Sequence, residues 1–322
     1  MAAEVGAPDL LELLAVWRFD LARDVGHLEE LVGLRMRSAG LRFDGQAIDT
    51  GIDWVARQVI AGKRMLTAED IAAAVDALDL RQGQARSIVS VATLELDPVA
   101  SDAVIALDWA DRFDGATAYT KRRPLAPATW DQLHQDIDAI PTALPSSARI
   151  LVTGSMRLPT AFTVGTALRM VTNVDLAVSQ GQEIWSSDTQ YVTATTPSVE
   201  QRSIDQGTEI AVAIGLATPI TDAVINYLQD NGIPVGELVS VGRPRGTHDA
   251  FIVGSHAANA LAYGIREAVR PLVRRHGRVH LFLAMPMGLA MLLGHRWNAM
   301  PTTTVYEDLV QDGYERAFTI DA

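Results

Sequence analysis

An internal repeat constrains the fold of this chain more than any other feature of its sequence. One copy reads Arg149-Ile-Leu-Val-Thr-Gly-Ser-Met156, and the other reads Arg278-Val-His-Leu-Phe-Leu-Ala-Met285, an offset of 129 residues. The helical pattern after each copy and the next β-type segment keep this offset, as do two pairs of small residues: Ala161 with Ala290, and Gly165 with Gly294. Because strand, turn, helix and next strand coincide in register, the sequence predicts two halves of related architecture.

The region from about residue 95 onward alternates short β-type runs with amphipathic stretches. The predicted strands are 103–109, 149–153, 174–178, 209–214, 238–241, 278–283 and 303–306. The predicted helices are 127–140, 160–170, 218–228, 257–275 and 288–297. Such alternation is typical of an α/β fold with mainly parallel sheets. The polar, turn-rich segment 187–207 is expected to be a long surface loop.

The N-terminal part of the chain has a different pattern. Residues 8 to about 90 show apolar residues at helical spacing, and Thr67-Ala-Glu-Asp70 has the form of a capping box. We therefore expect a helical region over 1–95, followed by an α/β region over 96–322 with halves at about 100–205 and 206–322. The helical region is compatible with a protein-binding adaptor and with a plain packing domain, since periodicity reports burial and not purpose.

Composition restricts the function classes. The net charge of −12 argues against a protein that coats long DNA or RNA, because such affinity is built from neutralised phosphates. It does not exclude a small phosphodiester ligand held by a few arginines and backbone N–H groups in one pocket. The chain has no cysteine, no apolar run long enough for a bilayer, and no signal-peptide pattern at its start, so we expect a cytoplasmic protein without membrane contact.

Two strand-to-helix loops are the best candidates for a binding site. In a parallel α/β sheet, ligands gather where strands end and helices begin. Gly154-Ser-Met-Arg-Leu158 forms this junction in one half, and Ala284-Met-Pro-Met287 forms it in the other. Each loop alone is equally compatible with an ordinary turn. Related by a pseudo-dyad, the two loops would form one composite pocket suited to a ring of similar units.

Further candidates come from single residues near predicted strand ends. Trp185 is suited to stacking on a base, although a core position fits it equally well. Arg243, in a basic turn, is compatible with phosphate contact or with a solvated loop, and Lys121-Arg-Arg123 raises the same question. We find no motif of a hydrolase, metalloprotease or zinc site, and Asp108, Asp111 and Asp114 lack a further metal-binding partner, so no catalytic or metal site is expected.

These residues together resemble the SAVED family. The resemblance covers about residues 100–322 and rests on motifs in the family's order: Leu107-Asp-Trp-Ala-Asp-Arg-Phe113, Arg123-Pro124, Trp130, Ile150–Arg157, Gly165, Trp185, His280–Pro286 and Gly294. It implies two fused CARF-like, Rossmann-like halves. It also implies that the domain senses a cyclic di-, tri- or tetranucleotide in anti-phage systems of the CBASS or type III CRISPR kind, self-associates, and activates an effector domain or a separate effector protein.

The resemblance assigns roles only to matching positions. Gly154 and Ser155 would donate backbone N–H groups, and Arg157 and, less directly, Arg243 would pair with phosphate. Base contacts would come from Met156, Met285, Met287, Pro286 and, from its position only, Trp185. Leu158 and Ala284 are carried over as binding positions of the same two loops without a specific role. The nuclease, TIR, protease or membrane effector typical of the family is not visible in the sequence. No cofactor is implied. Two alternatives stay open, a ring nuclease that degrades the ligand and a scaffold that recruits a partner.

Overall fold

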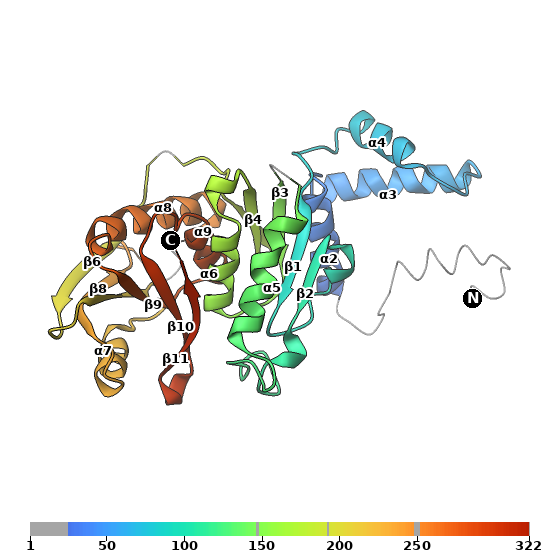
Figure 1. Cartoon of the computed structure of the whole chain (residues 1–322). Helices are drawn as coiled ribbons and strands as arrows, with labels where there is room; N and C mark the ends of the chain where they lie inside the picture. Colours follow the sequence, from blue (N-terminus) through green and yellow to red (C-terminus); the bar gives the residue numbers. More distant parts are fainter. Residues whose placement is uncertain (1–24, 146–147, 192, 248–251, 322) are drawn as a thin grey trace. The chain divides into compact units, whose positions relative to one another are not determined.

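The chain divides into two compact units, which are described separately. The first comprises residues up to Arg37 together with Arg42–Leu80, and the second comprises Ser38–Leu41 together with Arg81 onward. The structure is a computed structural model, and the residues it describes are 25–145, 148–191, 193–247 and 252–321. Figure 1 shows the order of the helices and strands along the chain.

Three helices make up the described part of the first unit: α2 (Val25–Ser38), α3 (Gly45–Ile60) and α4 (Ala68–Ala77). Helix α3 begins at Asp44, whose side chain accepts a hydrogen bond from the Ala47 backbone N–H at 2.8 Å. Helix α4 begins at Thr67, which forms the capping box with Asp70 that the sequence predicted. The part of the helical prediction before residue 25 lies outside the described residues.

The second unit contains two sheets with helices around them. The first sheet has the strand order β2-β1-β3-β4-β5, in which only β5 is antiparallel to its neighbour. Its elements in chain order are β1 (Ser87–Ala92), β2 (Ile105–Asp108), α5 (Trp130–Ala143), β3 (Arg149–Thr153), α6 (Leu158–Ala167), β4 (Asp175–Gln180) and β5 (Glu183–Ser186).

The second sheet has the strand order β11-β10-β9-β7-β8-β6, with parallel central strands and antiparallel edge strands β6 and β11. Its elements are β6 (Ser198–Ser203), β7 (Glu209–Gly215), α7 (Thr221–Asp230), β8 (Val235–Gly242), α8 (Gly254–Val273), β9 (Arg278–Ala284), α9 (Met287–His295), β10 (Thr302–Asp308) and β11 (Tyr314–Ile320).

The predicted repeat is present in the fold. The series β3-α6-β4-β5 matches β9-α9-β10-β11, and in both series the last strand returns antiparallel to the one before it. Helices α6 and α9 lie against each other between the two sheets (Figure 1). One buried apolar cluster runs through both halves, and in it the rings of Phe162 and Trp297 meet edge-on at 5.4 Å. The predicted α/β architecture of two related, mainly parallel halves is confirmed.

Two local predictions were wrong. Residues 87–90 were predicted to be helical, but they belong to β1, whose run Ser-Ile-Val-Ser-Val-Ala is buried between β2 and β3. A short apolar run does not distinguish a buried strand from a helix. Segment 187–207 was predicted to be a loop, but 198–203 forms β6. This strand is polar because it is an exposed edge strand, and its pairing with β8 assigns it to the second sheet.

Candidate functional site

A pocket of about 340 Å³ lies where strands β3, β9 and β10 end. Both halves of the repeat contribute to it. Its lining residues are Arg122, Met156, Arg157, Leu158 and Pro159 from the first half and Ala217, Leu283, Ala284, Met285, Tyr306, Glu307 and Asp308 from the second. The two predicted loops therefore meet at one composite pocket, at the sheet edge where α/β folds bind ligands.

The conformation of the first loop depends on Gly154. Its φ of +97° is one that side chains rarely adopt, and a Cβ atom there would lie 2.2 Å from the backbone oxygen of Val91. This close approach brings β1 and the loop together. The Ser155 carbonyl oxygen then accepts hydrogen bonds from the backbone N–H groups of Thr93 at 2.9 Å and Leu94 at 3.1 Å.

The second loop repeats this arrangement. Ala284, the repeat equivalent of Ser155, accepts backbone hydrogen bonds through its carbonyl oxygen from Leu216 at 2.9 Å and Ala217 at 2.8 Å. In each half, a residue at or shortly after the end of one strand, β3 or β9, is thus hydrogen-bonded to the two residues that follow the neighbouring strand, β1 or β7. The repeat visible in the sequence extends to the hydrogen bonds that shape the pocket.

Two helices begin at the pocket loops without a side-chain cap. Arg157 is the N-cap residue of α6 and Pro286, its repeat equivalent, is the N-cap residue of α9. Neither supplies a side-chain hydrogen bond to its helix. The first backbone N–H groups of a helix have no partner within it, and the helix dipole adds partial positive charge there. Only the start of α6 lines the pocket and favours an anionic group there; at the start of α9, the Gly288 N–H already donates to Oε1 of Gln180 at 2.7 Å.

Arg157 is held from several sides in the pocket. Its Nη2 donates to the carbonyl oxygen of Ala118 at 3.0 Å and to that of Lys121, both in the loop between β2 and α5. Its Nε lies 3.6 Å from Oε1 of Glu307 and has no hydrogen-bond partner among the described residues. Burial lowers the pKa of Arg157, against the opposing effect of Glu307.

Glu307 is a buried carboxyl group at the end of β10. Its side chain is only 4% exposed, and Nη1 of Arg122 lies 3.9 Å from its Oε1. Burial raises the pKa of Glu307 to about 8, although Arg157 and Arg122 act in the opposite direction. The pocket thus contains two guanidinium groups beside a carboxyl group whose neutral form is favoured by burial.

The structure places the predicted site residues in three groups. Met156, Arg157, Leu158, Ala284 and Met285 line the composite pocket. Gly154, Ser155, Pro286 and Met287 belong to the same two loops but do not line it.

Arg243 and Trp185 form the third group and do not line the pocket, although Arg243 contacts the lining residue Ala217. Arg243 lines a neighbouring cavity of about 340 Å³, and its guanidinium donates to the carbonyl oxygens of Leu216 at 2.6 Å and Ala217 at 2.9 Å. Trp185 lies inside β5 and not after a strand as predicted. It is buried, and its indole N–H donates to Glu183 at 2.8 Å. Trp185 therefore occupies the core position that its sequence context also allowed.

Several lining residues were missed at the sequence level. Tyr306, Glu307 and Asp308 end β10, which is parallel to β9 and so ends at the same sheet edge. The offset of the repeat pairs the predicted strand 174–178 with 303–306, and following that strand to its end would have led to these three residues. Arg122 was noted only as a basic residue of unknown role. It reaches the pocket because the carboxylate of Asp114 accepts the backbone N–H groups of Arg122 at 2.7 Å and Arg123 at 3.0 Å.

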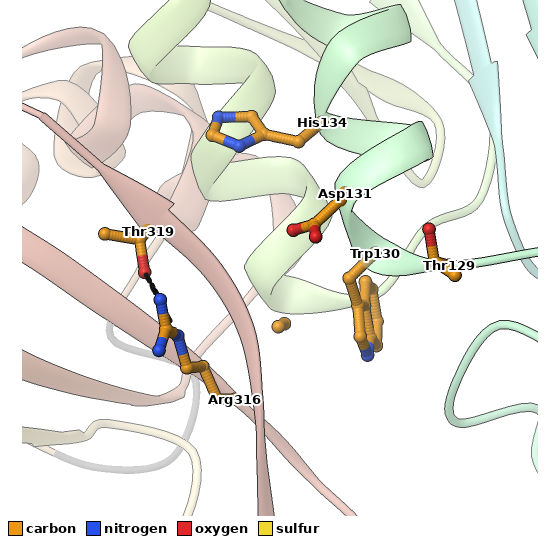
Figure 2. A pocket seen from close by; sticks show the side chains of 7 residues that line it. Thr129, Trp130, Asp131, His134, Arg316 and Thr319 are labelled. Carbon is orange, nitrogen blue, oxygen red and sulfur yellow. Dashed lines mark hydrogen bonds between the residues drawn. The ribbon is translucent and has the colours of Figure 1, made fainter.

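A larger cleft of about 440 Å³ lies between α5 and β11 (Figure 2). Thr129, Asp131 and His134 of α5 face Arg316 and Thr319 of β11 across it, and Arg316 donates to the Thr319 hydroxyl at 2.7 Å. The start of α5 lies in this cleft, but its backbone is capped by Thr129 and its first turn carries Asp131, which disfavours an anion. We therefore take the smaller composite pocket as the site.

The described residues offer neither a metal site nor a membrane-spanning helix. They contain no cluster of three or more histidine and acidic side chains placed to hold a metal ion. None of the helices among them has both the length and the apolar character needed to span a membrane.

Solved structures with the same fold include SAVED/CARF-domain containing receptors. One is the Acinetobacter baumannii Cap4 SAVED/CARF-domain containing receptor with the cyclic trinucleotide 2′3′3′-cAAA, with a TM-score of 0.58 and 18% identity over 79% of this chain and 55% of that chain. The same receptor with 3′3′3′-cAAA has a TM-score of 0.55 and 18% identity, over 79% of this chain and 56% of that chain. The Moraxella osloensis Cap4 SAVED/CARF-domain containing receptor has a TM-score of 0.54 and 19% identity, over 79% of this chain and 54% of that chain. This chain therefore corresponds to little more than half of each of these proteins.

Sequence comparison identifies the family. No curated protein sequence matches the chain. A family model does match, that of SAVED, the SMODS-associated and fused to various effectors sensor domain, over residues 133–320. This range includes both pocket loops and the whole second sheet. Together with the fold, it shows that the chain belongs to the SAVED family of sensor domains.

Proposed function

We propose that this chain binds a cyclic oligonucleotide in the composite pocket. The observation that carries the proposal is the meeting of the two repeat loops at one pocket with Arg157 and Arg122 in its lining. A ring of similar nucleotides offers similar chemical groups on opposite sides, which matches a site made of two related halves. The first half would supply the start of α6 for a phosphate, and each half would supply one methionine, Met156 or Met285, for a base face.

The ligand class has support from the relatives. Acinetobacter baumannii Cap4 has been solved with 2′3′3′-cAAA and with 3′3′3′-cAAA. A cyclic trinucleotide is therefore the first candidate here. The pocket volume of about 340 Å³ is at the small end of the range for small-molecule sites. A ring of three nucleotides would fill it and project outward, which leaves part of the ring available for contact with a second molecule.

Membership of the SAVED family also suggests what happens after the ligand binds. The ligand-bound domain would self-associate and switch on an effector, either in a longer version of this protein or in a separate chain. In this proposal residues 96–322 act as the sensor and residues 1–95 as the linker or adaptor, in the cytoplasm.

A thermal-shift screen against cyclic di-, tri- and tetranucleotides of mixed linkage tests the proposal. A ligand that binds only the folded state raises the melting temperature by an amount set by its concentration relative to Kd. We expect one ring to stand out, and we expect the Arg157→Ala variant to lose the shift. Recovery of the ring after long incubation distinguishes a sensor from a ring nuclease. No shift with any ring would contradict the proposal and favour a scaffold role.

A further inference from the structure

Glu307 is an unexpected residue in a pocket for a polyanion. Four charged side chains line the pocket, Arg122, Arg157, Glu307 and Asp308. With all four ionised, their charges cancel. A phosphodiester entering such a pocket would gain little from the two arginines, because each already lies beside a carboxylate.

The position of Glu307 makes it the competitor for both arginines. Its Oε1 lies 3.6 Å from Nε of Arg157 and 3.9 Å from Nη1 of Arg122. These two guanidinium groups come from different elements, the start of α6 and the loop between β2 and α5. The carboxyl group of Glu307 is thus the point where they converge, and when ionised it competes with a phosphate for the same two positive charges.

The repeat shows that this feature belongs to one half only. With the offset of 129 residues, Glu307 corresponds to Val178 and Arg157 corresponds to Pro286. The charged cluster therefore has no counterpart across the pseudo-dyad. Glu307 and Arg157 are titratable or charged, whereas their repeat equivalents Val178 and Pro286 are apolar.

We infer that Glu307 determines the affinity of this pocket for an anionic ring. In its ionised form it neutralises the guanidinium groups of Arg157 and Arg122 and repels phosphate, and in its neutral form it leaves both groups to the ligand. This inference rests on the proposed function and adds the residue that controls it. The binding-competent pocket is the one in which the Glu307 carboxyl group carries a proton.

The surroundings of Glu307 permit this proton to be present at neutral pH. Burial raises the pKa of Glu307 to about 8. The charged groups around it come from every neighbouring element: Arg157 at the start of α6, Arg122 and Asp114 in the loop before α5, Asp308 at the end of β10, and Glu315 opposite it on β11. Glu315 is itself paired, with Arg123 at 3.2 Å and with the indole N–H of Trp130 at 2.8 Å.

A pH series of binding measurements tests the inference. The probe is whichever ring of the thermal-shift panel, with 2′3′3′-cAAA and 3′3′3′-cAAA included, binds the wild-type protein most tightly at pH 6. Phosphodiesters do not titrate between pH 6 and 9, so the phosphates of the ring contribute no pH dependence in this range, and any contribution of its bases is the same for every protein variant. Above the Glu307 pKa, each pH unit weakens the affinity by up to about tenfold, because binding then requires uptake of a proton.

Glu307→Gln and its matched control separate the possible outcomes. Glu307→Gln keeps the shape and removes the charge, so its Kd at pH 9 is expected to be about tenfold lower than that of wild type, while the two agree within about twofold at pH 6. Glu315→Gln removes one charge from the adjacent strand outside the pocket and is expected to follow wild type. Unfolding curves at each pH verify that all three proteins are folded.

The two proposals fail in different ways. If wild type binds a ring and Glu307→Gln shows the same pH dependence, or weaker binding at pH 9, the inference about Glu307 is overturned and the proposed function stands. If no ring binds wild type even at pH 6, the proposed function fails and the inference fails with it.

Discussion

Gly165 of α6 and Gly294 of α9 occupy equivalent positions of the repeat, and each lies against the backbone of the other helix. A Cβ atom on Gly165 would lie 2.1 Å from the carbonyl oxygen of Met291, and one on Gly294 would lie 2.1 Å from that of Phe162. Phe162 and Met291 are themselves repeat equivalents. The two contacts are therefore copies of one contact, and they bring together the helices that follow the two pocket loops.

A side chain at either glycine is expected to separate these helices. Gly165→Ala and Gly294→Ala each place a methyl group where the opposing backbone lies, and each should lower the free energy of unfolding by about 1–3 kcal/mol in urea titrations. Gly277→Ala is the control, because nothing lies within 4 Å of a Cβ atom at Gly277. Equal stability of the three variants would show that the helix contact is not tight.

Arg157→Lys is expected to release the loop between β2 and α5. Lysine cannot reproduce the guanidinium hydrogen bonds to the carbonyl oxygens of Ala118 and Lys121. The loop contains trypsin sites after Lys121 and Arg122. Limited trypsin digestion followed by mass spectrometry should show faster cleavage there than in wild type. Arg202→Lys, at an exposed ion pair in β6, should leave the rate unchanged. Unaltered cleavage in Arg157→Lys would mean that Arg157 does not hold the loop.

Tyr306→Phe is expected to destabilise the second sheet. The Tyr306 hydroxyl lies 2.8 Å from Nδ1 of the buried His280, whose Nε2 lies 2.6 Å from the Glu209 carboxylate. Loss of the hydroxyl leaves a buried ring nitrogen without this partner, at a cost of about 1–3 kcal/mol in the free energy of unfolding. Tyr119→Phe, at an 88% exposed position, should have no measurable effect. A Tyr306→Phe protein as stable as wild type would indicate that water replaces the hydroxyl.

The stability of the protein should also depend on pH through Glu307. Its pKa is raised to about 8 in the folded chain from an ordinary value of 4.5, so the folded state holds a proton that the unfolded state releases. This contribution to stability is complete below pH 4.5 and is lost as the pH rises from 4.5 to 8.

Glu307→Gln lacks this loss. Its free energy of unfolding relative to wild type should therefore increase by about 1 kcal/mol per pH unit over that window. Urea titrations at pH 5, 6.5 and 8 measure the difference. A constant difference would show that Glu307 has an ordinary pKa in the folded protein.

The sequence was sufficient to predict the fold class and the two pocket loops, because both follow from the repeat. The secondary structure of segments without a repeat signal or an alternating pattern was harder to predict. The run of β1 is apolar on both faces, and β6 is polar because it lies at a sheet edge. Glu307 was missed for a different reason. Its importance comes from Arg122 and Arg157, which are distant in sequence and approach it only through tertiary contacts.

Isothermal titration calorimetry of the wild-type chain at pH 6 with the tightest-binding ring tests the central claim most directly. If the two repeat loops form one composite pocket, one ring should bind per chain, and Arg157→Ala should abolish the heat of binding. Two rings per chain would mean that each half binds its own ligand. That result, or undiminished binding by Arg157→Ala, would contradict a single site shared by the two halves.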